Sequence, residues 1–169
     1  AVPLLKVDHL SKSFATRKTG LLGFGTADSS VAVDNVSFEL FRGECLGLVG
    51  ESGCGKTTTS KILMRAIAAD SGDVSFNDHG EVIDVLALKE RELIRYRRQV
   101  QYIFQDPCSS LNPRMTVFDI ISEPLLIHRV GDEDERFESV KELMTLVGLD
   151  VRYLRRYPLS YTHQTQTTS

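Results

Sequence analysis

The chain has 169 residues, of which 41% are hydrophobic and 25% charged, a composition that suits roughly one globular domain and excludes a largely disordered chain. The net charge of −3 gives no reason to expect nucleic acid as a partner. The longest apolar runs are too short to span a bilayer, and the three cysteines form no C-x-x-C pair, which favours a reduced cytosolic setting.

The first part of the chain alternates between apolar and polar residues and is interrupted by turn residues, a pattern typical of strands. Residues 15–30 are rich in Gly, Thr and Lys and have no period, so we expect a long surface loop there. A charged helix is predicted over residues 89–98. The predicted strands are residues 4–10, 31–41, 74–76 and 82–85.

A glycine-rich segment lies between a predicted strand and a predicted helix. Residues 44–49 are expected to form a short buried strand containing Cys45, and residues 58–68 carry apolar side chains at helical spacing. Between them, residues 50–57 read Gly-Glu-Ser-Gly-Cys-Gly-Lys-Thr and fit the pattern G-x-x-x-x-G-K-[ST] at every fixed position. Strand, glycine-rich loop and helix in this order are the setting of a P-loop.

This loop has the chemistry needed to hold a chain of phosphates. Glycines let the backbone curl so that successive N–H groups point inward, and the helix that follows adds the positive end of its dipole. We predict that Lys56 reaches the β- and γ-phosphates of a nucleotide and that the Thr57 hydroxyl binds Mg²⁺. The predicted nucleotide-binding residues of the loop are Gly50, Glu51, Ser52, Gly53, Cys54, Gly55, Lys56, Thr57 and Thr58.

The second half of the chain is predicted to be mainly helical, after a short strand over residues 101–104. Pro124 should kink or end the first of these helices. That helix is indicated by the spacing of Val117, Ile120 and Ile121.

An amphipathic helix is predicted over residues 134–147, and Gly148 should stop it. The chain then changes in composition. Residues 160–169 contain no aliphatic residue and no formal charge, so we expect residues 159–169 to be a disordered tail.

Four stretches make the chain resemble the ATP-binding subunit of ABC transporters, and more narrowly the ATPases of bacterial oligopeptide, dipeptide and nickel importers. One is the approach to the P-loop, and the second is the P-loop itself, the family's Walker A motif. The third is similar to the family's Q-loop, and the fourth resembles its continuation in peptide importers. These stretches are residues 33–38 with 42–44, then 48–58, 100–107 and 109–117.

The resemblance implies an α/β fold of the P-loop NTPase class, with a parallel core sheet, an antiparallel β subdomain and a helical subdomain over about residues 113–154. Residues 1–158 would be a partial nucleotide-binding domain, incomplete at its C-terminal end. By the same likeness, Gln105 would ligate Mg²⁺ and sense the γ-phosphate, so Lys56 and Gln105 would be the catalytic residues. Phe14 would stack on the adenine of ATP.

The implied partners are a second ATP-binding subunit and the transmembrane permease subunits of an importer. ATP and Mg²⁺ would be the cofactors, and the chain would be cytoplasmic and peripheral on the inner face of the cell membrane. The transported solute is not encoded in these motifs.

The sequence also departs from the family pattern. After Arg156-Tyr157-Pro158, the family has Leu-Ser-Gly-Gly-Gln, whereas residues 159–164 read Leu-Ser-Tyr-Thr-His-Gln. No apolar run ending in Asp-Glu follows, so the chain lacks a Walker B motif and its general base. A truncation or a frameshift would produce this pattern, and so would a natural short paralogue.

The leading hypothesis is therefore an importer ATPase subunit present as an incomplete copy, which binds ATP but hardly hydrolyses it. The alternative is a non-hydrolysing nucleotide-binding module or regulator that pairs with an intact ATPase. A GTPase is disfavoured because the chain has no Asn-Lys-x-Asp motif. A small-molecule kinase should have an arginine-rich lid over the phosphates. It is disfavoured because the clustered arginines of this chain lie in the predicted helix before the Q-loop, where a solvated face is expected. These residues are Arg91, Arg95, Arg97 and Arg98.

Overall fold

The structure is a computed structural model that describes residues 2–17, 27–106 and 110–158, and the chain divides into two units, Ala1–Gln101 and Tyr102–Ser169. Each unit has its own hydrophobic core. The expected tail over residues 159–169 lies outside the described residues.

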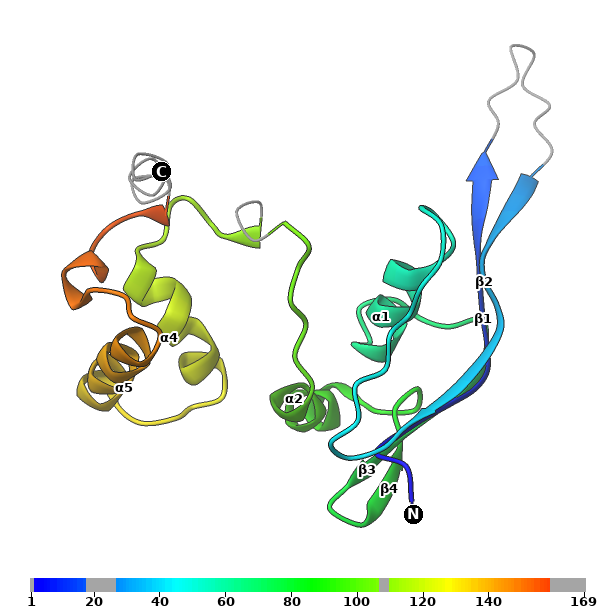
Figure 1. The fold of residues 1–169 in the computed structure, drawn as a ribbon, viewed down its shortest axis with the longest axis horizontal. Helices are drawn as coiled ribbons and strands as arrows, with labels where there is room; N and C mark the ends of the chain where they lie inside the picture. The colour runs from blue at the N-terminus through cyan, green and yellow to red at the C-terminus, as the bar shows by residue number, and fades with distance from the viewer. Residues whose placement is uncertain (1, 18–26, 107–109, 159–169) are drawn as a thin grey trace. The chain divides into compact units, whose positions relative to one another are not determined.

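The first unit is built on a four-stranded sheet in the order β2-β1-β3-β4 (Figure 1). Its strands are β1 (Leu5–Arg17), β2 (Ala27–Leu40), β3 (Ser71–Asp78) and β4 (Glu81–Asp84), and every pairing is antiparallel. All four predicted strands are thus confirmed. The expected loop over residues 15–30 is wrong at both ends, because ladder hydrogen bonds extend β1 and β2 without needing an apolar period.

The core of this unit depends on an irregularity in β1. Val7 and Leu10 are both fully buried, although three residues of regular strand would place them on opposite faces. The register of β1 against β2 shifts between these two residues, and His9 between them has a φ of 49°. The shift turns both side chains towards one core, where they pack with Val74 and Ile62.

Two helices cover this core, α1 (Lys56–Leu63) and α2 (Glu90–Gln99). Tyr96 of α2 packs edge-on against Phe76 with ring centroids 5.4 Å apart, and its hydroxyl donates to the carbonyl oxygen of Leu63 at 2.8 Å. Burial raises the pKa of the Tyr96 hydroxyl to about 12, so it remains a donor. Arg97 adds hydrogen bonds to the carbonyl oxygens of Met64 and Arg65.

A buried carboxylate attaches α2 to the sheet. Asp78, at the end of β3, accepts hydrogen bonds from Gln99 and Arg95, each at 2.8 Å. The bond from Gln99, together with the positive charge of Arg95, lowers the pKa of Asp78. Arg91, Arg95, Arg97 and Arg98 are all exposed, as expected of a solvated face, and Arg95 and Arg97 also make hydrogen bonds that hold α2 in place.

Two expected strands are not formed. Residues 44–49 and 101–104 have no ladder partner among the described residues, and Cys45, expected to be buried, is exposed. Parallel pairing is likewise absent from the described strands, although the mixed α/β class is confirmed. A strand exists only as part of a ladder, so an extended apolar sequence alone does not create one.

The second unit contains α4 (Val117–Ile127), α5 (Glu133–Leu146) and the 3₁₀ turn η1 (Val151–Tyr153). Pro124 was expected to kink or end this helix, and because it lies inside α4, the helix does not end there. Only one helical hydrogen bond is lost there, and a capping box between Thr116 and Asp119 fixes the start of the helix.

The core of the second unit is small and is closed by backbone hydrogen bonds. Val140, Met144 and Leu154 are buried together. The N–H groups of Val117 and Phe118 at the start of α4 donate to the carbonyl oxygens of Arg156 and Leu154 at 2.9 Å. These bonds satisfy helix donors that have no partner within the helix.

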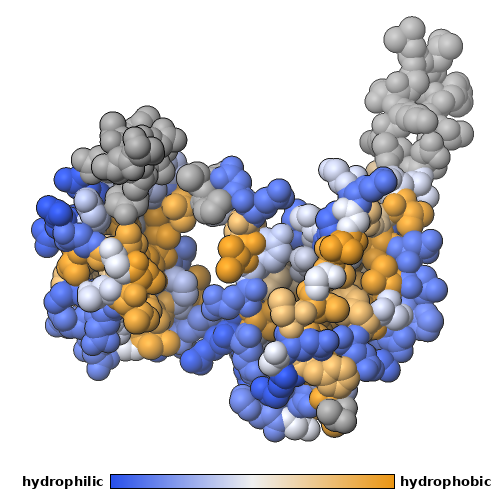
Figure 2. All heavy atoms as spheres, in the orientation of Figure 1, coloured by the Kyte–Doolittle hydropathy of each residue, from blue (hydrophilic) through white to orange (hydrophobic). Residues whose placement is uncertain are grey.

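Apolar surface gathers on both units between charged areas (Figure 2). The exposed hydrophobic residues of the first unit include Leu46, Leu48 and Val49, and those of the second include Leu143, Leu146 and Val147. No helix in the described part of the chain is long and apolar enough to cross a membrane.

Candidate phosphate-binding site

The glycine-rich segment leads directly into α1 and is fixed there by its last glycine. Gly55 is the N-cap residue of the helix, with a φ of 94°, a conformation that L side chains rarely adopt. A Cβ built on Gly55 would collide with the carbonyl oxygen of Ala32 on β2. Glycine is therefore required here twice, for its backbone angle and for its contact with the strand.

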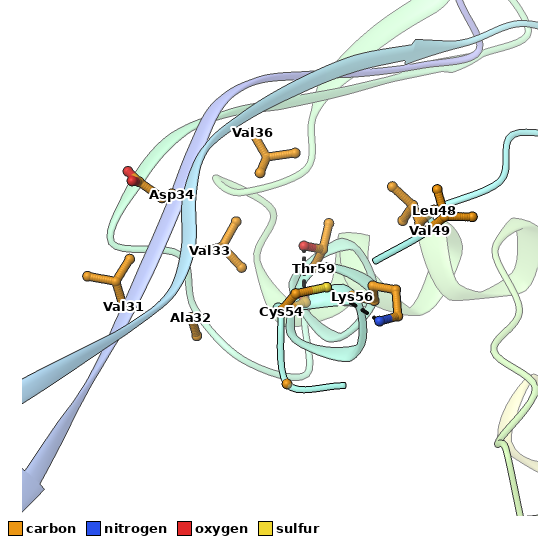
Figure 3. A pocket seen from close by; sticks show the side chains of 12 residues that line it. Val31, Ala32, Val33, Asp34, Val36, Leu48, Val49, Cys54, Lys56 and Thr59 are labelled. Atoms are coloured by element: carbon orange, nitrogen blue, oxygen red, sulfur yellow. Dashed lines mark hydrogen bonds between the residues drawn. The ribbon is translucent and has the colours of Figure 1, made fainter. Parts of the chain in front are cut away.

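The Lys56 ammonium group folds back into the loop. Its Nζ donates to the carbonyl oxygens of Gly50 and Glu51, each at 2.7 Å. It also lies 3.4 Å from the Sγ of Cys54 (Figure 3). The lysine thus closes the loop into a ring at the N-terminus of α1. A bound phosphate would meet a positive charge that is already held at the mouth of the helix.

A pocket of about 360 Å³ lies beside this ring, between the loop and β2. Val33 and Val36 point from β2 towards the loop, whereas Asp34 points away from it (Figure 3). Leu48, Val49 and the side chains of Cys54 and Lys56 line the other side. The volume lies in the range of small-ligand sites.

Some hydroxyl groups of the first helical turn bind the backbone, whereas that of Thr57 is exposed. The hydroxyl of Thr59, which is buried, donates to the carbonyl oxygen of Gly55, and the hydroxyl of Ser60 donates to that of Lys56, both at 3.1 Å. Thr57 and the loop residues Glu51 to Cys54 are exposed, and Thr58 is half-buried. The structure therefore brings the predicted loop residues, from Gly50 to Thr58, together around one helix end.

The chemistry of the loop suits the phosphates of a nucleotide. Gly55 leaves no room for a side chain, so the loop backbone itself lines the site. Mg²⁺ prefers oxygen ligands and usually keeps only one or two from the protein, the rest being phosphate oxygens and water. The hydroxyl of Thr57, exposed in the first turn of α1, is an oxygen ligand of that kind.

Phe14 lies on the hairpin that carries the pocket wall. Its ring is 44% exposed, and Lys12 Nζ stands 5.5 Å from the ring centroid, so both side chains project from the same face of β1. Lys12 pairs with Val33 across the strands, and Val33 is buried and lines the pocket. Phe14 therefore faces the loop side of the sheet, although it does not line the pocket itself.

Gln105 belongs to the second unit and is exposed. The structure describes the two units separately, so it does not bring Gln105 and the loop together. Its neighbours Pro107 to Ser109, part of the stretch that resembles the Q-loop and its continuation, lie outside the described residues.

Sequence reasoning missed two residues beside Phe14. Asp70 Oδ1 lies 2.6 Å from Lys12 Nζ, and Asp70 Oδ2 accepts the backbone N–H of Ser13 at 2.7 Å. The bond from Lys12, and then that from Ser13, holds the pKa of the Asp70 carboxyl below its ordinary value of 3.8. Nothing in the local sequence indicates this contact, because Lys12 and Asp70 lie in different elements and fit no motif.

A glycine-rich loop closed by a lysine at the head of a helix defines the P-loop class of nucleotide-binding proteins. The family model described as "ABC transporter" matches residues 33–167. The chain therefore belongs to the ABC transporter family of ATP-binding proteins, as the sequence resemblance predicts.

Within this family, the chain is similar to the ATP-binding proteins of oligopeptide and glutathione import systems. The chain is 46% identical over 157 residues to the oligopeptide transport ATP-binding protein OppF of Bacillus subtilis (strain 168), covering 92% of this chain and 47% of that protein. It is 45% identical over 158 residues to the glutathione import ATP-binding protein GsiA of Pectobacterium atrosepticum, covering 94% of this chain and 24% of that protein. The chain thus spans half or less of the length of these relatives.

Solved structures support the fold. A dimeric structure of the ATP-binding cassette MJ0796 in a post-hydrolysis state, bound to ADP and Pi, gives a TM-score of 0.70 at 24% identity. That match covers 91% of this chain and 61% of the solved chain. A second dimeric structure of MJ0796 gives a TM-score of 0.72.

Proposed function

We propose that this chain is part of an ATP-binding subunit that energises the import of peptides or similar small solutes through an ABC transporter. The observation that carries the proposal is the ring that Lys56 closes with Gly50 and Glu51 at the head of α1. Membership of the family and the names of the import ATPases it resembles support the same assignment.

In this proposal the loop binds the phosphates of ATP. The backbone N–H groups around Gly53 and Gly55 surround the phosphate chain, and Lys56 leaves the carbonyl oxygens to pair with the β- and γ-phosphates. Bound Mg²⁺ supplies positive charge to the same phosphates, and Thr57 and Gln105 are its proposed protein ligands. Phe14 is the proposed contact for the adenine ring.

The proposed partners are a second ATP-binding subunit and the permease subunits of the importer. Dimeric neighbours of the same fold support the first, and the names of the import relatives support the second. The proposed location is the inner face of the cell membrane, where an import ATPase would meet its permease.

This stretch of chain should bind ATP without turning it over at an appreciable rate. Its sequence contains Lys56 and Gln105 but no Walker B carboxylate to orient water, and catalysis of phosphoryl transfer depends on such positioning. The alternative function, a non-hydrolysing module that pairs with an intact ATPase, makes the same prediction for the isolated chain. Co-purification with a full-length homologue would favour that alternative.

Direct titration of ATP and Mg²⁺ against the purified chain tests the proposal. Lys56→Ala removes two or more charge-assisted contacts to phosphate, each worth about 1.5–3 kcal/mol, so ATP binding should weaken at least about 100-fold. Lys61→Ala is the matched control, because Lys61 is exposed on the same helix and should leave binding unchanged.

Equal binding by the wild type and Lys56→Ala would contradict the assignment of the phosphate site. Rapid hydrolysis by the pure chain that disappears in Lys56→Ala would contradict the expected lack of turnover.

A further inference from the structure

Asp70 holds three consecutive residues of β1. Its carboxylate accepts from Lys12 Nζ at 2.6 Å and from the N–H of Ser13 at 2.7 Å, and its own N–H donates to the carbonyl oxygen of Ser11 at 3.0 Å. Asp70 lies immediately before β3, in the connection that follows the P-loop helix. We call Lys12, Ser13 and Asp70 the β1 clamp.

The clamp begins where the sheet pairing ends. The last Cα partners of β1 and β3 are Ser11 and Ser71, so beyond Ser11 only β2 forms a ladder with β1. The register against β2 also shifts on both sides of Lys12. Without the Asp70 carboxylate, β1 would lose the hydrogen bonds at Lys12 Nζ and at the N–H of Ser13. Lys12 and Ser13 lie two residues and one residue before Phe14.

The same lysine covers one face of the Phe14 ring. Lys12 Nζ is 5.5 Å from the ring centroid while it remains bound to Asp70, a geometry in which the ammonium group and the ring attract each other. The Lys12 side chain is only 16% exposed, so it is held in this position rather than moving freely in water. One face of the ring is thus occupied, and only the other is open to a flat ligand.

We propose that the β1 clamp positions Phe14 to stack on the base of a bound nucleotide, with Lys12 and Asp70 as positioning residues. The inference rests on the proposed ATP-binding function and adds a part that the P-loop does not contain. Phosphates are held at the head of α1, whereas the clamp acts only on the base. It should therefore affect nucleotides that carry a base and have no effect on a bare chain of phosphates.

A pair of ligands separates the two sites. The full chain is titrated with ATP and with inorganic tripolyphosphate, each with Mg²⁺, for the wild type, Lys12→Met and Asp70→Asn. ATP binding should weaken at least about fivefold in both variants, since stacking contributes about 1 kcal/mol or more. Tripolyphosphate binding should stay the same.

Matched variants exclude a general loss of structure. Lys6→Met removes another β1 lysine, whose contact with Asp8 is a longer one of 3.7 Å between side chains 45% and 42% exposed, so both affinities should be unchanged. Lys12→Arg keeps a cation that can bind Asp70 and cover the ring, so it should retain most of the ATP affinity.

A spectroscopic signal reports the ring itself. The chain contains no tryptophan, so Phe14→Trp introduces a single emitter at the proposed stacking position. ATP should change its emission and tripolyphosphate should not. Adding Lys12→Met or Asp70→Asn to Phe14→Trp should reduce the change caused by saturating ATP.

Two results would overturn the inference. The ratio of ATP to tripolyphosphate affinity could stay unchanged in Lys12→Met and Asp70→Asn, whether neither ligand weakens or both weaken equally. The indole emission could also respond to ATP identically with and without the clamp. If the wild type binds neither ligand, the proposed function itself fails together with the clamp. If the wild type binds both ligands and Lys56→Ala binds neither, the phosphate site is established, and the clamp variants then test the clamp alone.

Discussion

The strand β1 and the segment over residues 44–49 were both expected to form strands, but only β1 does so. β1 lies between β2 and β3 and pairs with both, and its Val7 is 1% exposed. The segment before the P-loop has no ladder partner among the described residues, and its Val49 is 93% exposed. The difference shows that partners, and not apolar content, make a strand.

The comparison also shows how the P-loop is supported. A strand before the loop would hold it from its N-terminal side, but the described contacts lie on the other side. Gly55 lies against Ala32 of β2, and Lys56 binds the carbonyl oxygens of Gly50 and Glu51. The loop is therefore supported mainly by its contact with the antiparallel sheet and by its own lysine.

The largest expected effect contrasts two exposed cysteines, one in the loop and one in the unpaired segment. Alkylating Cys54, 3.4 Å from Lys56 Nζ, should block ATP binding, because the added group would fill the space beside the ammonium. Alkylating Cys45 should leave ATP binding unchanged. The measurement is ATP titration of single-cysteine variants, and ATP should protect Cys54 from labelling. Equal labelling of Cys54 with and without ATP would contradict the prediction.

A second test addresses the contact between the loop and β2. Gly55→Ala adds a methyl group against the carbonyl oxygen of Ala32 at a positive φ, so it should lower the free energy of unfolding by about 3 kcal/mol. Gly53→Ala, at a φ of 86° with nothing within 4 Å of the new Cβ, should cost only about 1 kcal/mol. Urea denaturation measures both. Equal costs would mean that the loop does not depend on β2.

A third test compares the two extended segments directly. Val7→Ala should lower the free energy of unfolding by about 2 kcal/mol, because a buried side chain is lost from the core. Val49→Ala should change it by less than about 0.5 kcal/mol, because Val49 is exposed. Hydrogen exchange should likewise be slow in β1 and fast over residues 44–49. A large cost at Val49 would show that the segment is paired in solution.

The smallest effect is a pH dependence of the clamp on β1. The pKa of folded Asp70 lies below 3.8, so the carboxylate stabilises the fold above that pH, and the contribution disappears as the pH falls through the lowered pKa. The difference in stability between the wild type and Asp70→Asn should therefore shrink on acidification below about pH 4. A difference that stays constant down to pH 2 would contradict the contact.

Much of the fold could be predicted from local pattern. The four strands, the helices α1, α2 and α5, and the loop around Lys56 carry periodicity, caps or a motif in their own residues. The strand predicted over residues 44–49 is not formed, and the local pattern could not show this, because a strand depends on a partner elsewhere in the chain. The sequence left open whether Pro124 kinks or ends its helix, and the helix continues because a proline removes only one of its hydrogen bonds.

The site shows the same limit. Residues 50–58 could be predicted because the P-loop is a contiguous motif, and the structure brings them together around the head of α1. The contacts of Asp70 with Lys12 and Ser13 could not, because they depend on the end of the β1–β3 ladder and on a register shift. The roles of Phe14 and Gln105 remain predictions from the family resemblance.

The way that α2 holds the far end of α1 has a mechanical consequence. The carbonyl groups of Leu63, Met64 and Arg65, at and just beyond the end of α1, accept hydrogen bonds from Tyr96 and Arg97, so this end of the helix is fixed to α2. A pull on its N-terminal end is transmitted along the axis to those hydrogen bonds and into α2.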